Sequence, residues 1–104
     1  EVPVGFTVAR DWMSFVHAKK VRTIDLLYVE EVFRKCGIAT ALMAAVAKDA
    51  WSKGIRRIDT IANKKNHSAN AFYKQLGFEK RIPYGYDYRI EGKSLKDLSK
   101  QKVL

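Results

Sequence analysis

Residues 22–54 read RTIDLLYVEEVFRKCGIATALMAAVAKDAWSKG, and this stretch decides the fold. Residues 22–29 form an apolar run broken only by Asp25, which is typical of a strand buried on both faces. After a charged connection, Gly37 opens a run of strong helix formers that continues up to Gly54, the kind of residue with which helices commonly end. The stretch therefore predicts a buried strand followed by a long helix.

The segment after this helix predicts a return to the same sheet. Residues 55–62 form a strand anchored by Ile55, Ile58 and Ile61. Because a long helix separates it from residues 22–29, the two strands are expected to run parallel. The helix should pack on the sheet through one stripe, apolar until its end, made of Ile38, Leu42, Ala45, Val46 and Asp49.

The rest of the chain predicts short elements around this core. Residues 67–76 form a helix that Asn66 or Ser68 can cap. The remaining expected strands cover residues 2–10, 12–18, 78–82 and 86–90, with turns at Lys19-Lys20 and Pro83-Tyr84-Gly85. Residues 92–104 are a basic C-terminal segment that forms either a short amphipathic helix or a tail.

The composition describes one small domain with a strong positive charge. Its 104 residues are 47% apolar and 12% aromatic, which excludes a disordered chain. The net charge of +9 implies attraction to an anion such as nucleic acid, an anionic membrane or a phosphorylated small molecule. Since the basic residues are scattered in pairs, nucleic acid is not the expected partner. The longest nearly apolar run, residues 38–47, is too short to span a bilayer, and no membrane partner is expected.

The numbers and spacing of cysteine and histidine limit which disulfides and metal sites the chain can form. The single cysteine, Cys36, excludes an internal disulfide and favours a reducing compartment, so a cytoplasmic location is expected. Cys36 lacks the spacing to His17 and His67 that a zinc site requires, and no metal is expected.

The junction between the buried strand and the long helix is a candidate anion site. A helix N-terminus offers unpaired backbone N–H groups and a partial positive charge. Gly37 and the small Ala39 let the backbone approach an anion, while Arg34 and Lys35 add charge. Neither the Walker A nor the Rossmann glycine pattern is present. The plainer alternative is a tight loop with two exposed basic residues.

Two blocks of sequence resemble the GNAT acetyltransferase superfamily. Arg34-x-x-Gly37-x-Ala39 is similar to its R/Q-x-x-G-x-G/A signature, and the segment from Asn66 to Phe78 is similar to its second block. The resemblance covers roughly residues 2–90. It implies an α+β (α/β) fold with a mixed, mostly antiparallel central sheet, a splayed parallel strand pair and helices on both faces, in a domain over residues 1–91.

The resemblance also implies acetyl-CoA as cosubstrate, bound where strands 23–29 and 56–62 splay apart. Backbone groups of Leu27 and Val29 would hydrogen-bond pantetheine, and backbone N–H groups from Lys35 to Thr40 would hold the pyrophosphate. Asn66 would contact the CoA arm, although a plain helix cap is its simpler role. The full set of residues expected to bind acetyl-CoA is Leu27, Tyr28, Val29, Arg34, Lys35, Cys36, Gly37, Ile38, Ala39, Thr40, Asn66, Ala71 and Tyr73.

By the same resemblance, two residues would carry the chemistry of direct acetyl transfer to a primary amine of a small molecule or protein. Tyr73 occupies the position of the general acid that protonates the leaving thiolate, or else it is core packing. Asp25 would be the base, with its pKa raised by burial, or else a structural aspartate. Glu30 and Glu31 are the runners-up for the base.

Domains of this family usually carry a first strand and one or two helices before the strand matching residues 2–10, and the sequence lacks a match to them. This puts activity in doubt and leaves three explanations: the sequence is a fragment, a partner chain completes the sheet, or a shortened domain binds acyl-CoA but transfers the acyl group poorly. Of these we expect a homodimer, because an exposed strand edge favours association. A non-catalytic acyl-CoA-binding module, or a basic module that binds nucleic acid or another polyanion, is the alternative function. The block from Asn66 to Phe78 favours the enzyme, since polyanion binding has no use for it.

Overall fold

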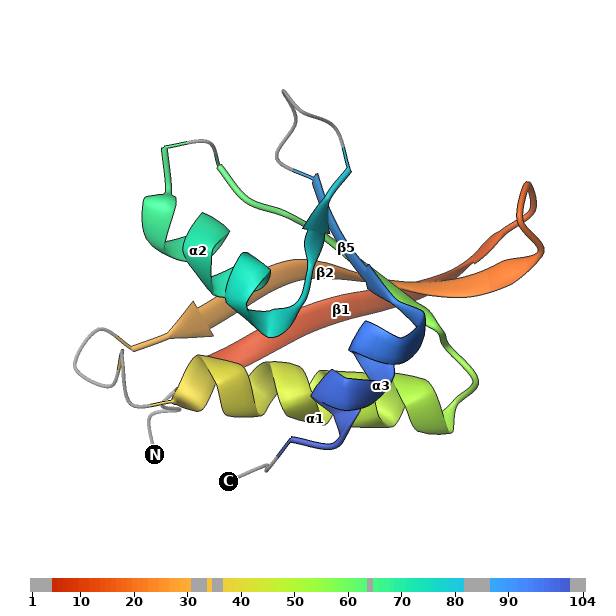
Figure 1. Ribbon diagram of the computed structural model, residues 1–104, viewed down its shortest axis with the longest axis horizontal. Helices are drawn as coiled ribbons and strands as arrows, with labels where there is room; N and C mark the ends of the chain where they lie inside the picture. The colour runs from red at the N-terminus through yellow and green to blue at the C-terminus, as the bar shows by residue number, and fades with distance from the viewer. Residues whose placement is uncertain (1–4, 31–33, 35–36, 64, 82–86, 102–104) are drawn as a thin grey trace.

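The computed structural model describes residues 5–30, 34, 37–63, 65–81 and 87–101, and within them the chain forms one mixed sheet and three helices (Figure 1). The strand order is β1-β2-β3-β5-β4. Only β2 and β3 run parallel among the described pairs, so the sheet is mixed and mostly antiparallel, as predicted. The elements are β1 Gly5–Ser14, β2 Lys19–Val29, α1 Ile38–Ser52, β3 Arg57–Ile61, α2 His67–Leu76, β4 Glu79–Lys80, β5 Asp87–Glu91 and α3 Gly92–Ser99.

The first two strands form one long hairpin, which corrects the predicted boundaries. Residues 2–10 and 12–18 were expected to be separate strands, yet β1 runs unbroken to Ser14 and pairs along its length with β2. The turn lies at residues 15–18, and the lysines expected to turn the chain begin β2 instead. The sequence signal for this turn is weak because it lacks Gly, Pro and Asn, and Ala18 takes the left-handed backbone conformation at φ 51°.

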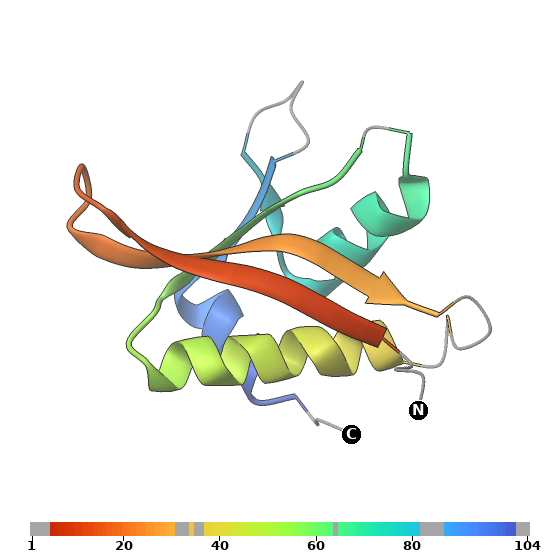
Figure 2. The ribbon, with the colours of Figure 1, turned by 180° about the vertical axis from the view of Figure 1, so that it is seen from behind.

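All of the described helices pack against the same face of the sheet (Figures 1 and 2). The family resemblance implied helices on both faces, whereas the described helices cover one. The apolar run at residues 22–29 predicted a β2 buried on both faces, and that expectation is wrong. Ile24 and Val29 are buried, whereas Leu26 is 47% and Tyr28 37% exposed. We call the other side of the sheet the bare face. Its exposed apolar side chains are Phe6, Val8, Trp12, Leu26, Tyr28 and Ile61.

Helix α1 buries its small side chains rather than the predicted stripe. Ile38, Leu42, Ala45 and Val46 are partly exposed and Asp49 is exposed, whereas the buried residues are Ala41, Met43, Ala44, Ala47 and Ala50. The physical reason is that α1 packs between the sheet and α3, and alanine lets both neighbours approach closely. Gly54 follows the helix with φ 80°, as a terminating glycine does.

The C-terminal half of the chain completes the core. The predicted ends of α2 are confirmed, because Asn66 caps this helix and Gly77 follows it at φ 103°. Ile55 and Ile58 are buried as expected, but Ile61 is 72% exposed, because strand alternation turns it to the bare face. Residues 92–99 form a helix whose Leu95 and Leu98 belong to the common core.

The last two expected strands are shorter or shifted. Residues 78–82 contribute only the two-residue β4 to the described sheet, and the strand expected at 86–90 is β5 at Asp87–Glu91. The predicted turn at 83–85 lies outside the described residues. None of the described helices is long and apolar enough to cross a membrane.

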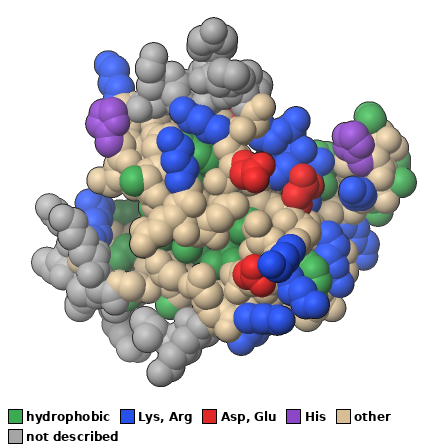
Figure 3. Space-filling view, viewed as in Figure 1, with side chains coloured by type: hydrophobic (Ala, Val, Ile, Leu, Met, Phe, Trp, Pro, Cys, Tyr) green, Lys and Arg blue, Asp and Glu red, His purple; other side chains and the backbone are tan. Residues whose placement is uncertain are grey.

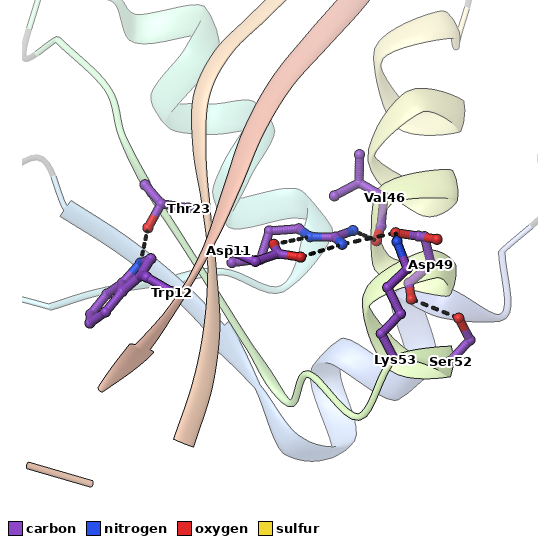
Figure 4. A network of polar contacts seen from close by, with 8 residues as sticks. Asp11, Trp12, Thr23, Val46, Asp49, Ser52 and Lys53 are labelled. Carbon is purple, nitrogen blue, oxygen red and sulfur yellow. Dashed lines mark hydrogen bonds and ion pairs between the residues drawn. The ribbon is translucent and has the colours of Figure 1, made fainter. Parts of the chain in front are cut away.

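A buried arginine, Arg22, ties the hairpin to α1, and Figure 4 labels its partners Asp11, Val46 and Asp49. The Arg22 guanidinium lies 2.8 Å from a carboxylate oxygen of both Asp11 on β1 and Asp49 on α1, and it donates to the Val46 carbonyl. Hydrogen bonding from Arg22 lowers the pKa of both carboxyl groups. This network explains why Asp49 stands at the end of the predicted apolar stripe.

Candidate functional site

The parallel strands β2 and β3 separate after three paired positions. Arg22, Thr23 and Ile24 pair with Ile58, Asp59 and Thr60, and the ladder stops there. On the other side of β2 the register shifts, because Val8 faces Leu26 while the next residue of β1 faces Ile24, so that Asp25 is a bulged residue. A bulge bends and twists its strand, which turns the end of β2 away from β3. The predicted splayed pair is thus confirmed, and we call the opening between residues 25–29 and 61–63 the fork.

The fork forms a cleft of about 190 Å³. Both strands, the segment after β3 and helix α2 contribute to its wall. Its lining residues are Asp25, Leu26, Leu27, Thr60, Ile61, Ala62, Asn63, Asn66, Ala69 and Tyr73. Several larger surface hollows occur elsewhere, for example one of about 500 Å³ between the hairpin turn and Gly54, but none of the motif residues lines that one. The cleft thus brings together Leu27, Asn66, Tyr73 and Asp25 from the predicted site.

Backbone alternation directs the end of β2 into this cleft. The Leu26 carbonyl accepts a hydrogen bond from Thr7 Oγ1 at 3.0 Å and therefore points toward β1. Since successive backbone groups of a strand point to opposite sides, those of Leu27 and Val29 point toward the fork. The Val29 carbonyl accepts from Arg34 Nε at 3.0 Å. These are the two residues whose backbone was expected to bind pantetheine.

Helix α1 begins beside the end of β2 with an uncapped N-terminus. Its N-cap is Gly37 at φ 80°, and among the described residues no side chain caps the helix and no acidic residue lies in its first turn. A Cβ added to Gly37 would meet no described atom within 4 Å. The amides of Ile38, Ala39 and Thr40 in that first turn are therefore not engaged by any described side chain and can bind an anion.

Arg34 has a structural contact beside this helix start. Its guanidinium bonds to the Val29 carbonyl and lies over the Tyr28 ring, 5.9 Å from the ring centroid. Arg34 thus ties the loop back to β2 and places positive charge near the start of α1. Lys35 and Cys36, which were also expected to hold the pyrophosphate, lie outside the described residues.

Helix α2 forms the opposite wall of the cleft. Asn66 caps this helix by accepting a hydrogen bond from the Ala69 amide at 3.0 Å, and it lines the cleft as well. The structure therefore shows the capping role and leaves room for the contact with CoA. Ala71, by contrast, is exposed and does not line the cleft, since helical periodicity puts it on a different side from Ala69 and Tyr73.

Tyr73 belongs both to the core and to the cleft. Its ring packs against Phe72, Phe78 and Tyr88 at centroid distances of 5.4, 5.3 and 5.6 Å. Burial raises the pKa of the Tyr73 phenol, and a hydrogen bond with Thr60 opposes part of that rise. The phenol is consequently protonated near neutral pH and can donate a proton into the cleft. Sequence reasoning missed Thr60, whose only signal is its place on the inner side of strand β3.

Asp25 lies on the bare side of the cleft and is not buried. Its side chain is 41% exposed, and the Arg10 Nε donates to its two carboxylate oxygens at 3.2 and 3.1 Å. The expectation that Asp25 is buried is therefore wrong, because the bulge turns the residue outward. The runner-up Glu30 accepts a hydrogen bond from the Tyr28 hydroxyl at 3.2 Å, and Glu31 lies outside the described residues.

The part of the chain that the structure describes contains no group of three His, Cys, Asp or Glu side chains that could hold a metal ion. The charged residues beside the cleft instead form ion pairs. On the bare face Asp59 accepts from Arg57 and Arg89, with closest distances of 2.7 and 3.0 Å. Partial burial raises the pKa of the Asp59 carboxyl, but the two guanidinium groups outweigh this effect and hold it below its usual range.

Comparisons with known proteins identify a family and a relative that this sequence resembles. Residues 1–78 match the model of the acetyltransferase (GNAT) family. The chain is 35% identical over 80 residues to an uncharacterised N-acetyltransferase of Methanocaldococcus jannaschii, which covers 76% of this chain and 35% of that protein. It therefore spans about a third of the length of the curated relative that it matches.

Solved structures share the fold at lower identity. The NatC complex bound to a Gag peptide and CoA contains a chain with TM-score 0.79 and 19% identity, matched over 86% of this chain and 62% of that chain. Arabidopsis thaliana NAA60 in complex with acetyl-CoA gives TM-score 0.71 and 21% identity over 86% of this chain and 66% of that chain. PH1933 from Pyrococcus horikoshii gives TM-score 0.66 and 30% identity over 83% of this chain and 55% of that chain.

Proposed function

Because the chain belongs to the acetyltransferase (GNAT) family, we propose that it transfers the acetyl group of acetyl-CoA to a primary amine. One observation carries this proposal: the buried residue Tyr73 lines a cleft that opens between two parallel strands, next to a helix N-terminus that no described side chain caps. Two proteins of similar fold are bound to CoA or acetyl-CoA, which supports the same cosubstrate in this chain.

The proposed binding mode follows the line from α1 into the fork. The pyrophosphate lies at the first turn of α1, where Gly37, Ile38, Ala39 and Thr40 offer backbone N–H groups to an anion. Pantetheine continues along the backbone of Leu27 and Val29. The remaining proposed contacts are Tyr28, Arg34, Lys35, Cys36, Asn66 and Ala71, of which Ala71 is the least supported because it is exposed on α2.

In the proposed reaction the neutral amine attacks the thioester carbon directly. The new C–N bond forms, the C–S bond breaks, and the leaving sulfur takes the proton of the Tyr73 phenol or hydrogen-bonds to it. Burial keeps that phenol protonated until the thiolate develops. We assign the amine proton to Asp25, directly or through water, because this residue lines the other side of the same cleft, where its carboxylate also forms an ion pair with Arg10. The acceptor is a small molecule or a protein amine.

The proposed assembly is a homodimer in the cytoplasm. Strand β1 is an edge of the described sheet, and the bare face exposes apolar side chains beside it, including Val8 at 46%. Exposed edges and apolar patches of this kind favour association. Sedimentation equilibrium of the chain tests the dimer, and a monomer at all concentrations would contradict it. The cytoplasmic location stays a prediction from the cysteine content.

Acetyl-CoA binding is tested first, by thermal shift, with ATP and heparin as anion controls. A ligand present at about 100 times its dissociation constant stabilises the fold by about 2.7 kcal/mol. We expect a shift with acetyl-CoA that survives moderate salt and exceeds that with ATP. Equal shifts with all three anions, abolished by salt, would mean that the site is a patch of charge.

Turnover is tested next, with a panel of amines and detection of released thiol. Tyr73→Phe should lower kcat by about a hundredfold or more while acetyl-CoA still shifts the melting temperature. A chain that binds acetyl-CoA but acetylates none of the amines would instead support the acyl-CoA-binding alternative. Asp25→Asn should lower the rate at neutral pH if Asp25 accepts the amine proton.

A further inference from the structure

Thr60 lies at the point where the fork closes. It forms, with Ile24, the last paired position of β2 and β3, and its Oγ1 donates to the Ile24 carbonyl at 3.2 Å. The residue is 3% exposed, and it lines both the cleft and a second hollow on the bare face, which Asp59 and Asp87 also line. Thr60 therefore joins the two strands at the base of the cleft with a side-chain hydrogen bond.

The same residue lies beside the Tyr73 phenol: Thr60 pairs across the sheet with Tyr88, whose ring packs on that of Tyr73 at 5.6 Å, and Thr60 and Tyr73 line the same cleft. Three aromatic rings pack against the ring of Tyr73, so its hydroxyl is the part of the side chain that can form a hydrogen bond. The nearby phenol of Tyr88 donates to Asn70 on α2 instead of to Thr60. A bond with Thr60 lowers the pKa of the Tyr73 phenol, as a donor to the phenolate oxygen does, so the single Thr60 O–H bonds to the Ile24 carbonyl while the phenol is protonated and can turn to the phenolate.

We propose that Thr60 is a positioning residue for acetyl transfer: it fixes the base of the fork and orients the phenol of Tyr73 toward the leaving sulfur. This inference rests on the proposed function of the cleft. A single short side chain thus couples the geometry of the cosubstrate site to that of the proton donor, because its hydroxyl bonds to one strand of the fork and the residue lines the same cleft as the donor.

The hydroxyl also has a role once the proton has moved. When the phenol O–H bond breaks and an S–H bond forms, the electron pair stays on the phenolate oxygen of Tyr73. Thr60 can then rotate its O–H from the Ile24 carbonyl to that oxygen and donate to it, which stabilises the charge. The phenolate takes a proton back from water before the next turnover.

The kinetic test compares Thr60→Val, which removes the hydroxyl at nearly constant volume, with Thr60→Ser, which keeps it. We expect Thr60→Val to lower kcat by about tenfold with little change in the KM for acetyl-CoA, and Thr60→Ser to recover most of the loss. In a Tyr73→Phe background, Thr60→Val should change kcat less than about twofold, since the group that it orients is gone. An equal loss in both backgrounds would show a merely structural role and overturn the proposal.

Thr7→Val is the matched control for this series. Thr7 Oγ1 donates to the Leu26 carbonyl at 3.0 Å, so its removal also deletes a threonine bond to the backbone of β2, but on the side away from Tyr73. We expect its kcat and its KM for acetyl-CoA to match those of the unmodified chain. If Thr7→Val lowered kcat as much as Thr60→Val, loss of strand support alone would explain both, and the proposal would fail.

A second readout does not depend on activity. In chain labelled with ¹³C at the tyrosine ζ carbon, the Tyr73 signal is identified by its loss in Tyr73→Phe. Removing the hydrogen bond should move the titration midpoint of that signal upward by about half a pH unit in Thr60→Val but not in Thr60→Ser. An unchanged midpoint overturns the contact on which the inference rests. If the unmodified chain acetylates no amine, the proposed function fails, while this titration still decides whether Thr60 holds the phenol.

Discussion

Asp59 should be the main source of acid sensitivity on the bare face of the sheet. Its carboxylate lies between Arg57 and Arg89, and the three side chains are 24%, 10% and 16% exposed. Removing one partner of a buried ion pair typically costs about 3–5 kcal/mol, and partial exposure here reduces this to about 2–3 kcal/mol. Since about 1 kcal/mol shifts Tm by about 4–8 °C at this size, Asp59→Asn should lower Tm by about 10–20 °C.

The direction in which stability changes with pH follows from the pKa of Asp59. The pKa of Asp59 is lowered in the folded chain, because the two guanidinium groups outweigh the effect of burial. Its stabilisation is therefore complete above the unfolded pKa of about 3.9 and is lost as the pH falls through the lower folded pKa. Urea unfolding between pH 2 and 7 measures this change. The free energy of unfolding should fall steeply at acid pH in the unmodified chain and less steeply in Asp59→Asn.

Asp97→Asn is the control for general acid effects, because Asp97 is an exposed aspartate on α3. The free energy of unfolding of Asp97→Asn should fall at acid pH as steeply as that of the unmodified chain. Stability curves of the unmodified chain and Asp59→Asn that stay parallel from pH 2 to 7 would refute the reasoning, since they would show that the protonation of Asp59 does not differ between folded and unfolded chain.

Three further predictions concern the cosubstrate site, the C-terminal helix and the buried arginine. Gly37→Ala should weaken acetyl-CoA binding by about tenfold in calorimetry, whereas Gly54→Ala, at the same φ of 80° and equally free of contacts, should carry the same backbone strain and leave binding unchanged. Leu98→Ala should destabilise the chain by about 2–5 kcal/mol in urea unfolding, because Leu98 is 1% exposed in the common core; a value near zero would make residues 92–104 a dispensable tail. Arg22→Met should lower Tm and detach α1 from the hairpin, seen as faster hydrogen exchange in α1, and unchanged exchange would contradict the role of the network.

Local sequence signals predicted the parts of the fold that depend on local chemistry. Gly54 and Gly77 mark the ends of two helices, and the Asn66 cap marks the start of one, because each acts within a single turn. The parallel pairing of β2 and β3 also followed from the sequence, since a helix as long as α1 separates them. The cleft residues were identified through the motif resemblance rather than through local chemistry.

The errors arise where burial depends on what covers a face. The apolar run Leu26-Leu27-Tyr28 looks like a strand buried on both sides, yet the described helices cover one side, so Leu26 and Tyr28 are exposed. The same reason places Ile61 in solvent. For Asp25 the missing information was the bulge, which changes the direction of one side chain and leaves no mark in the alternation of the sequence.

The fork itself explains why an anion should bind at one helix start and not at the other. Each of its two strands leads into a helix, β2 into α1 and β3 into α2, so two helix N-termini open near the same cleft. At α2 the Asn66 side chain already accepts from the Ala69 amide, whereas at α1 no described side chain does so. An anion at α1 therefore gains backbone donors without displacing a cap, while an anion at α2 would compete with Asn66. In the proposed binding mode this asymmetry favours α1 for the pyrophosphate and leaves α2 to supply Tyr73, the proposed proton donor, from its buried side.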